Sequence, residues 1–275
     1  MTRPHPRGLT PARTGLPGWL LVPAGLAVAF VAVPLLGMLV RVPFADVVTL
    51  LSSRASLDAL GLSLLTCVVA TAISLLVGLP LALVLARSDG RLAGLTRTLV
   101  TIPMVLPPVV AGLALLITFG RRGVLGAPLA ALGIEVGFTT IAVVMAQVFV
   151  AMPFLITSVE GAVRAAGSGY EGAAATLGAS PTYALAHVTL PLLAPSIASG
   201  AALTFARALG EFGATITFAG SLQGTTRTLP LEIYMLRELD TDSALALSLV
   251  LIIVAGLTVA VTGWFSRRTV RRGVA

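Results

Sequence analysis

The chain has 275 residues, of which 57% are hydrophobic and 11% are charged, and its mean hydropathy is +1.01. Soluble domains carry about 25% charged residues, so this composition excludes a water-soluble globular protein and makes the lipid bilayer its solvent. The net charge of +7 comes from arginine, because all 18 basic residues are Arg. Since these arginines lie at the ends of apolar runs, we expect them to orient membrane spans and not to bind nucleic acid.

The residues needed for several kinds of catalytic or metal site are missing. A Walker A loop requires a lysine for the β- and γ-phosphates, and the chain has no lysine. The single cysteine, Cys67, lies in an apolar run and is expected to be a buried hydrophobe. His5 and His187 have no ligand-like spacing, and no nucleophile-elbow, zinc-protease or paired CxxC motif is present. We therefore predict no catalytic, metal or cofactor site in this chain.

The N-terminal 40 residues divide into a polar tail and an apolar run. Residues 1–15 contain three arginines among several Pro and Gly residues and predict a cytoplasmic tail. Residues 16–40 contain no charge over 25 positions. The apolar core of a cleaved signal peptide is about 7–15 residues long, so this run predicts a retained first transmembrane helix.

Five further apolar runs follow, and each is at least as long as the roughly 20 residues that a helix needs to cross the hydrocarbon core. They lack the alternation of barrel strands, so they predict helices. The fold class expected is therefore all-α integral membrane, with six transmembrane helices and the last five in a domain spanning 57–266. Residues 267–275 are expected to form a cytoplasmic tail. The five runs are 59–86, 98–120, 136–159, 191–220 and 243–266.

Prolines and arginines add two expectations about these spans. The proline-rich segment 102–112 either carries tolerated kinks or bends a helix beside a pathway. With the N-terminus inside, eleven arginines fall in cytoplasmic segments and six on the opposite side. Because basic residues collect in cytoplasmic loops, the sequence predicts a multi-pass protein of the cytoplasmic membrane with both termini in the cytoplasm.

The segment 160–190 lies between the fourth and fifth runs, on the predicted cytoplasmic side. It is too long for a tight turn and contains an alanine-rich helix followed by Gly178, where a helix C′ glycine belongs. Ser180 then supplies an N-cap before a proline at the first helical position, and Pro191 is expected to end the second helix. The pattern predicts two short helices whose small side chains let a partner approach closely. A solvated connector is the alternative.

This segment resembles the cytoplasmic signature loop of ABC importer permeases, which reads EAA, three residues, Gly, nine residues, then I-x-LP. Aligned on the glycine, the Ala-Ala and Leu-Pro pairs match, Val188 stands in for Ile, and the family's first Glu falls on a glycine. The resemblance, over roughly 57–264, implies a type I ABC importer transmembrane-domain fold with a cytoplasmic coupling helix seated on an ATP-binding subunit. It implies that the ATPase-coupling residues are Glu171, Gly172, Ala173, Ala174, Gly178, Leu190 and Pro191.

The run 191–220 carries two charges four residues apart, on one face of a helix. Charges inside membrane helices are rare, costly and usually functional. A structural ion pair and the lining of a translocation path for an anion both remain open. At 30 residues, or about 45 Å as helix, the run exceeds the hydrocarbon core, so a break at 210–213 is expected. The small-polar stripe at helical spacing comprises Ser196, Gly200, Thr204, Arg207, Glu211 and Thr215.

Two stretches resemble the sulfate and molybdate branch of these permeases. FARALGEFGA, 205–214, is similar to the branch's fifth-helix motif, and GTTRTLPLEIY, 224–234, looks most like molybdate permeases. The resemblance implies a homodimeric permease for molybdate, with cytoplasmic subunits that bind the ATP and an extracytoplasmic substrate-binding protein that docks on the 224–234 loop. Sulfate, thiosulfate or tungstate as substrate, and a self-sufficient secondary anion transporter, are the alternatives. No catalytic constellation supports a membrane enzyme.

Overall fold

The computed structural model describes residues 17–272, and all regular structure in that range is helical. The chain divides into two compact units, residues 1–42 and 43–275. In the first unit a short 3₁₀ turn, Gly18–Leu20, leads into α1, Leu21–Arg41, which buries no residue. The predicted first transmembrane helix is thus present, although it ends at Arg41. The predicted tail 1–15 lies outside the described residues.

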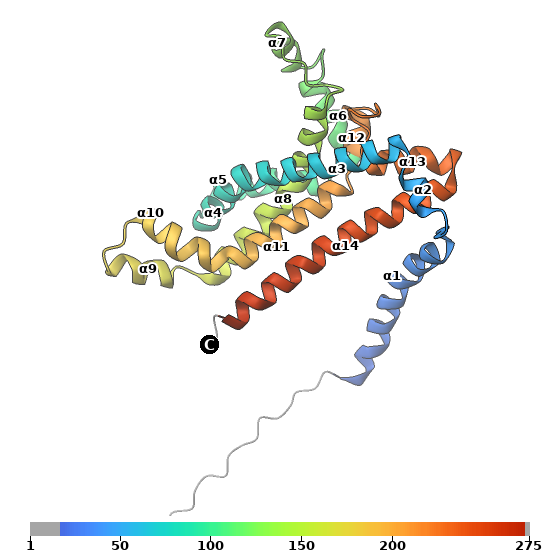
Figure 1. Ribbon diagram of the computed structural model, residues 1–275. Coiled ribbons are helices and arrows are strands. Elements are labelled where there is room, and N and C mark those ends of the chain that lie inside the picture. The colour runs from blue at the N-terminus through green and yellow to red at the C-terminus, as the bar shows by residue number, and fades with distance from the viewer. Residues whose placement is uncertain (1–16, 273–275) are drawn as a thin grey trace, which may run out of the picture. The chain divides into compact units, whose positions relative to one another are not determined.

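The second unit is a bundle built around α8 and α11, which pack on each other more extensively than any other pair (Figure 1). The helices α3, α4 and α14 pack against this pair. The small α9 and α10 lie at one end of the long helices, and α6, α12 and α13 lie toward the other end (Figure 1). The helices are α2 Val47–Leu51, α3 Arg54–Ile73, α4 Leu79–Arg87, α5 Arg91–Val105, α6 Pro108–Phe119, α7 Gly126–Ala131, α8 Thr140–Ala166, α9 Gly169–Thr176, α10 Pro181–Ala184, α11 Leu190–Leu209, α12 Gly213–Phe218, α13 Leu229–Leu239 and α14 Thr241–Arg272.

Five helical segments within residues 17–272 are long and apolar enough to cross a membrane, and a sixth crossing results if the bent pair α5 and α6 counts as one span. The predicted third span is therefore not one straight helix. Its two halves meet at 115°. Leu106 adopts an extended conformation between them, because a residue before proline is pushed out of the helical region. Of the two alternatives for 102–112, the structure shows a sharp bend, and its position beside a pathway stays a prediction.

Two long helices contain a π-helical turn at the same distance from a proline. Ser74–Gly78 joins α3 to α4 ahead of Pro80, and Leu185–Thr189 joins α10 to α11 ahead of Pro191. Each proline thus lies just after a π-helical turn inside a continuous helix, where local π adjustment compensates for its missing N–H. The expectation that Pro191 ends a helix is wrong, because the helix runs from 181 to 209 without interruption.

The helices α6 and α12 approach each other through glycines. A Cβ added to Gly112 would lie 2.7 Å from both the Ala214 carbonyl oxygen and the Thr217 Cβ. One added to Gly213 would lie 2.5 Å from the Pro108 Cβ. Small residues allow close backbone approach between membrane helices, so the break after Val105 and the break after Leu209 are packed together.

Replacing Gly112 with alanine should destabilise the protein by about 1–3 kcal/mol, because the added methyl group overfills this contact. The measurement is the thermal unfolding of the purified protein in detergent. Gly94→Ala is the control, since nothing lies within 4 Å of a Cβ added at Gly94, and alanine favours a helix over glycine. Equal melting temperatures for the two variants would contradict the packing described.

The helix α14 begins with a side-chain cap. Asp240 accepts hydrogen bonds from the hydroxyl of Ser243 at 2.5 Å and from its amide at 3.2 Å. These bonds hold the pKa of Asp240 below its usual value. A lowered carboxyl pKa contributes stability that is present above the unfolded-state pKa and is lost as the pH falls through the folded-state value. Beyond the predicted sixth span, 243–266, α14 continues to Arg272.

Candidate functional site

The segment between α8 and α11 has the local structure that the sequence predicts around Gly178. Gly178 has φ +85°, and its amide donates to the Ala175 carbonyl while the Ala179 amide donates to the Ala174 carbonyl, both at 3.0 Å. This pair of bonds is the Schellman motif. Ser180 then caps α10 by accepting from the Tyr183 amide at 3.3 Å. The predicted C′ glycine and N-cap are both confirmed. The segment is shorter than the predicted 160–190, because α8 continues to Ala166.

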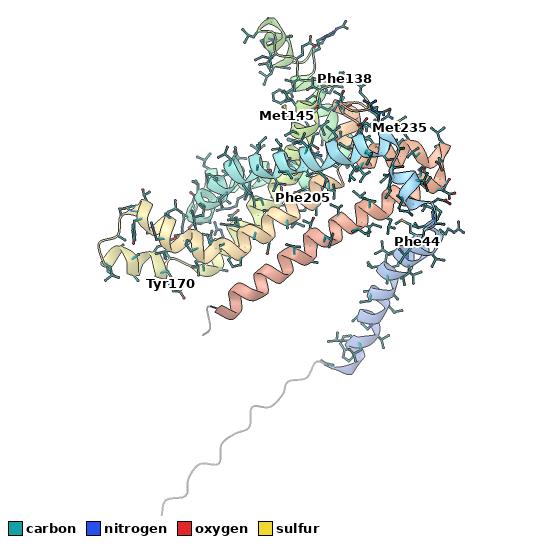
Figure 2. All side chains as sticks on the ribbon, viewed as in Figure 1. Phe44, Phe138, Met145, Tyr170, Phe205 and Met235 are labelled. Carbon is teal, nitrogen blue, oxygen red and sulfur yellow. The ribbon has the colours of Figure 1, made fainter. Side chains whose placement is uncertain are left out.

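Most of the surface of α9 is uncovered, and it combines small with large apolar side chains. Gly172 and Ala173 are exposed, and Ala174 is half-buried. Leu177 is 89% exposed, and Tyr170 lies at the same end of the bundle with 63% exposure (Figure 2). Exposed apolar groups that gather in one place mark interaction sites. This face of α9 is therefore a candidate partner surface.

Glu171, on the same helix, is turned toward the rest of the bundle. Its Oε2 lies 2.6 Å from Nη2 of Arg87, the last residue of α4. Its Oε1 accepts a hydrogen bond from the hydroxyl of the buried Thr189 at 2.7 Å. Arg87 also donates through both terminal nitrogens to the Gly167 carbonyl, at 3.2 Å each. Arg87 and Thr189 were not among the predicted ATPase-coupling residues.

A second group of charged side chains, centred on Glu160, lies beside this contact and was also absent from the predicted site residues. Glu160 is 9% exposed, and its Oε1 accepts from Nε of Arg97 at 2.6 Å and from Nε of Arg164 at 3.1 Å. Arg97 and Arg164 both donate to the carbonyls of Leu85 and Ser88. They thereby satisfy carbonyls at the C-terminus of α4, which favours positive charge. The signal in the sequence was a glutamate directly after the apolar run 136–159 and arginines next to the ends of the neighbouring apolar runs.

The remaining predicted coupling residues, Leu190 and Pro191, lie inside the continuous helix 181–209 and not on the exposed surface of α9. Leu190 is half-buried and Pro191 is exposed. The structure therefore brings Glu171, Gly172, Ala173, Ala174 and Gly178 together on one short helix and its cap. It places the Leu-Pro pair one helix further along the chain.

The polar stripe of the fifth span does not continue on one helix. The helix α11 ends at Leu209, Glu211 lies in the break, and Thr215 belongs to α12. The break predicted at 210–213 is confirmed, and it ends the regular spacing of the stripe. Ser196 is half-buried, and the three other members outside the ion pair are buried. A Cβ at Gly200 would lie 3.1 Å from a methyl of Leu155 in α8, so this part of the stripe faces protein.

Arg207 and Glu211 form an ion pair at the break, with Arg207 Nη1 2.8 Å from Glu211 Oε2. The Glu211 side chain is 1% exposed and the Arg207 side chain 28%. Glu211 Oε1 also accepts from the Ala214 amide at 2.8 Å, which caps α12. Among the described residues no donor is aligned with Oε2 for a hydrogen bond, and the hydroxyl of the buried Thr215 is likewise unpaired. The two charged groups are therefore close enough for an ion pair, but their relative orientation does not form a hydrogen bond between them.

The loop 224–234 is mostly packed inside the second unit. Thr226, Thr228 and Glu232 are each less than 5% exposed. Arg227 contacts Glu232 at 3.3 Å, and the Leu229 amide donates to the Ser63 hydroxyl at 2.6 Å. Its first two residues, next to the exposed Leu222 and Gln223, and its last residue, Tyr234, are exposed. The buried part of 224–234 holds α13 against α3. Docking of a substrate-binding protein on this segment stays a prediction.

A bundle of long apolar helices with two broken spans and a short exposed helix before the last long pair is the fold of ABC importer membrane domains. The structure of a bacterial alginate ABC transporter in complex with a periplasmic protein aligns with TM-score 0.71 at 19% identity, over 91% of this chain and 94% of that chain. The MetNI methionine ABC transporter aligns with TM-score 0.60 at 21% identity, over 78% and 95%. These similarities establish the type I importer fold.

Residues 78–272 match the family described as binding-protein-dependent transport system inner membrane component, and the chain belongs to this family. The molybdenum transport system permease protein ModB of Mycobacterium tuberculosis is 53% identical over 250 residues, covering 91% of this chain and 95% of the relative. The ModB of Escherichia coli K12 is 36% identical, covering 76% and 93%. The sulfate transport system permease protein CysW of Synechococcus elongatus is 35% identical, covering 88% and 92%. The chain is thus a multi-pass transport subunit of the membrane.

Proposed function

We propose that this chain is the membrane-spanning subunit of an ATP-driven importer for molybdate. The observation that carries the proposal is the 53% identity to a molybdenum permease over 91% of the chain. The 35% identity to a sulfate permease supports sulfate as the alternative substrate, and tungstate shares the charge and shape of molybdate. A self-sufficient secondary transporter is less favoured, because mid-membrane charges that could couple an ion are limited to Arg207 and Glu211 in the predicted spans.

The partners in this proposal are of three kinds. Two copies of the chain form a homodimer around the path. ATP-binding subunits seat on the exposed face of α9, and they bind and hydrolyse the ATP, since this chain has no lysine for a Walker A loop. A substrate-binding protein docks on the opposite side, and the structure of the alginate transporter in complex with a periplasmic protein supports a partner of this kind. In this arrangement α9 and both termini face the cytoplasm.

The proposed mechanism is alternating access driven through α9. Closure of the ATPase dimer moves α9, and the long helices attached to it tilt so that the path opens outward. Hydrolysis returns the helices to the inward-open arrangement. Arg207 and Glu211, at the packed breaks of two spans, are the proposed point where the anion passes. Ser196, which is half-buried, is proposed to line the path as well, and the buried Gly200, Thr204 and Thr215 are proposed to form its wall within the bundle.

Reconstitution of the chain with its ATP-binding subunits and binding protein in vesicles tests the proposal. Molybdate should be taken up in an ATP-dependent manner and should stimulate ATP hydrolysis more than sulfate does at equal concentration. Vesicles that contain the chain without the ATP-binding subunits are the control and should take up none. Uptake in those control vesicles would favour the secondary transporter, and preference for sulfate would replace molybdate as the substrate.

A further inference from the structure

Two long helices converge on the carboxylate of Glu171. One is the helix 54–87, which ends at Arg87, and the other is the helix 181–209, which contains Thr189. The two oxygens of Glu171 contact one helix each: Oε2 lies 2.6 Å from Arg87 Nη2, and Oε1 lies 2.7 Å from the Thr189 hydroxyl. A single side chain therefore connects α9 to both helices.

The surroundings make this contact more rigid than an ordinary surface pair. The Arg87 and Glu171 side chains are 38% and 30% exposed, and Thr189 is buried. Arg87 is held a second time by the Gly167 carbonyl, which belongs to the C-terminal cap of α8. A displacement of α9 would therefore move the C-terminal ends of α4 and α8 and the N-terminal end of α11 at the same time.

Both attached helices contain a place where bending is easy. A π-helical turn precedes Pro80 in the first helix, and another precedes Pro191 in the second. Sharp changes of helix direction occur at prolines and π-bulges. Movement of Glu171 would act on Arg87, the last residue of the first helix, and on Thr189, which lies in the π-helical turn of the second. Such movement could therefore bend each helix at its π-helical turn without breaking the rest of the helix.

We propose that Glu171 is the positioning residue that transmits movement of α9 to the helices 54–87 and 181–209 through Arg87 and Thr189. This inference rests on the proposed function, since it assigns the route by which an ATPase subunit would drive the path. It also assigns Glu171 an inward role. The surface that meets the ATPase is then left to the small residues of α9 and to Tyr170 and Leu177.

The first test compares Glu171→Gln, Arg87→Gln and the double variant in the reconstituted complex. Each single variant should still co-purify with the ATPase subunit but should lower the molybdate taken up per ATP hydrolysed by about fivefold or more, the lower end of ordinary coupling between sites. The double variant should lower this ratio no further than either single variant does, because both substitutions remove the same contact between Arg87 and Glu171. Arg91→Gln, at an exposed arginine that is the first residue of α5, should keep the wild-type ratio.

The hydroxyl contact has its own matched pair. Thr189→Val keeps the shape and removes the hydroxyl, and it should lower the uptake-to-ATP ratio. Thr189→Ser keeps the hydroxyl and should retain most of the ratio. Equal ratios for the two variants would overturn the Thr189 half of the route. An unchanged ratio in Glu171→Gln, or a double variant whose loss is the product of the two single losses, would overturn the Arg87 half.

A readout on the chain alone separates this inference from the proposed function. A spin label at Ala173→Cys, in a Cys67→Ala background, reports the mobility of α9. Glu171→Gln should increase that mobility, and Arg91→Gln should not. Wild-type vesicles that take up no molybdate would sink the proposed function, and the label would still decide whether Glu171 holds α9. Loss of ATPase co-purification in Glu171→Gln would instead make Glu171 part of the docking surface and overturn the inference.

Discussion

Replacing Arg207 with leucine should lower the stability of the protein by about 3–5 kcal/mol, the usual cost of removing one partner of a buried ion pair. The partner left behind, Glu211, is 1% exposed and keeps only the Ala214 amide as a hydrogen-bond donor among the described residues. The measurement is thermal unfolding of the purified chain in detergent. Arg237→Leu is the control, because Arg237 pairs with Glu238 on the surface and its removal should leave the melting temperature unchanged.

A second substitution distinguishes a structural role from a role in the path. Arg207→Leu/Glu211→Gln removes both charges and keeps an acceptor for the Ala214 amide, so most of the lost stability should return. If uptake also returns, the pair is structural. If the protein folds but uptake stays low, the pair belongs to the path that we propose. A single Arg207→Leu variant as stable as the wild type would show that the buried carboxylate needs no counter-ion.

Gly178→Val should uncouple ATP hydrolysis from uptake without unfolding the bundle. Gly178 has φ +85°, and an L-residue in the left-handed region costs about 1–2 kcal/mol. Nothing lies within 4 Å of a Cβ at this position, so the cost falls on the conformation of the turn and not on packing. A penalty of that size shifts a local equilibrium by about 5–30-fold. The ratio of molybdate imported to ATP hydrolysed should fall by a similar factor.

Gly178→Asn is the matched control for this prediction. Asparagine is tolerated in the left-handed conformation after a helix, so this variant should keep most of the coupling. Both variants should retain the wild-type melting temperature of the long helices, because α9 and its cap lie at the end of the bundle (Figure 1). Equal coupling in the valine and asparagine variants would contradict a role for the turn geometry.

The local features of the fold were predictable from neighbouring residues. The break at 210–213, the bend within 102–112 and the C′ glycine at 178 each depend on prolines or glycines a few positions away. The fate of Pro191 was not predictable in this way. Proline usually ends a helix, and here the preceding π-helical turn lets the helix continue by adjusting the backbone hydrogen bonds around Pro191.

The site shows the same division. The resemblance found α9, because its alanines and glycine are consecutive in the chain. It did not find Arg87 or Thr189, since Arg87 meets the Gly167 carbonyl across 80 residues of sequence and Thr189 meets Glu171 across 18. Helical spacing put the polar stripe on one helix, although the break after Leu209 separates Glu211 and Thr215 from the rest.

The sequence by itself determined that this protein lies in the membrane. Only 11% of its residues are charged, and its long uncharged runs can cross the hydrocarbon core as helices, which satisfy their own backbone polar groups. It also determined the family, through short motifs whose residues are adjacent. The tertiary structure decided which charges meet. Ion pairs between helices depend on how the long segments cross, and helix crossing is set by packing between residues far apart in the chain.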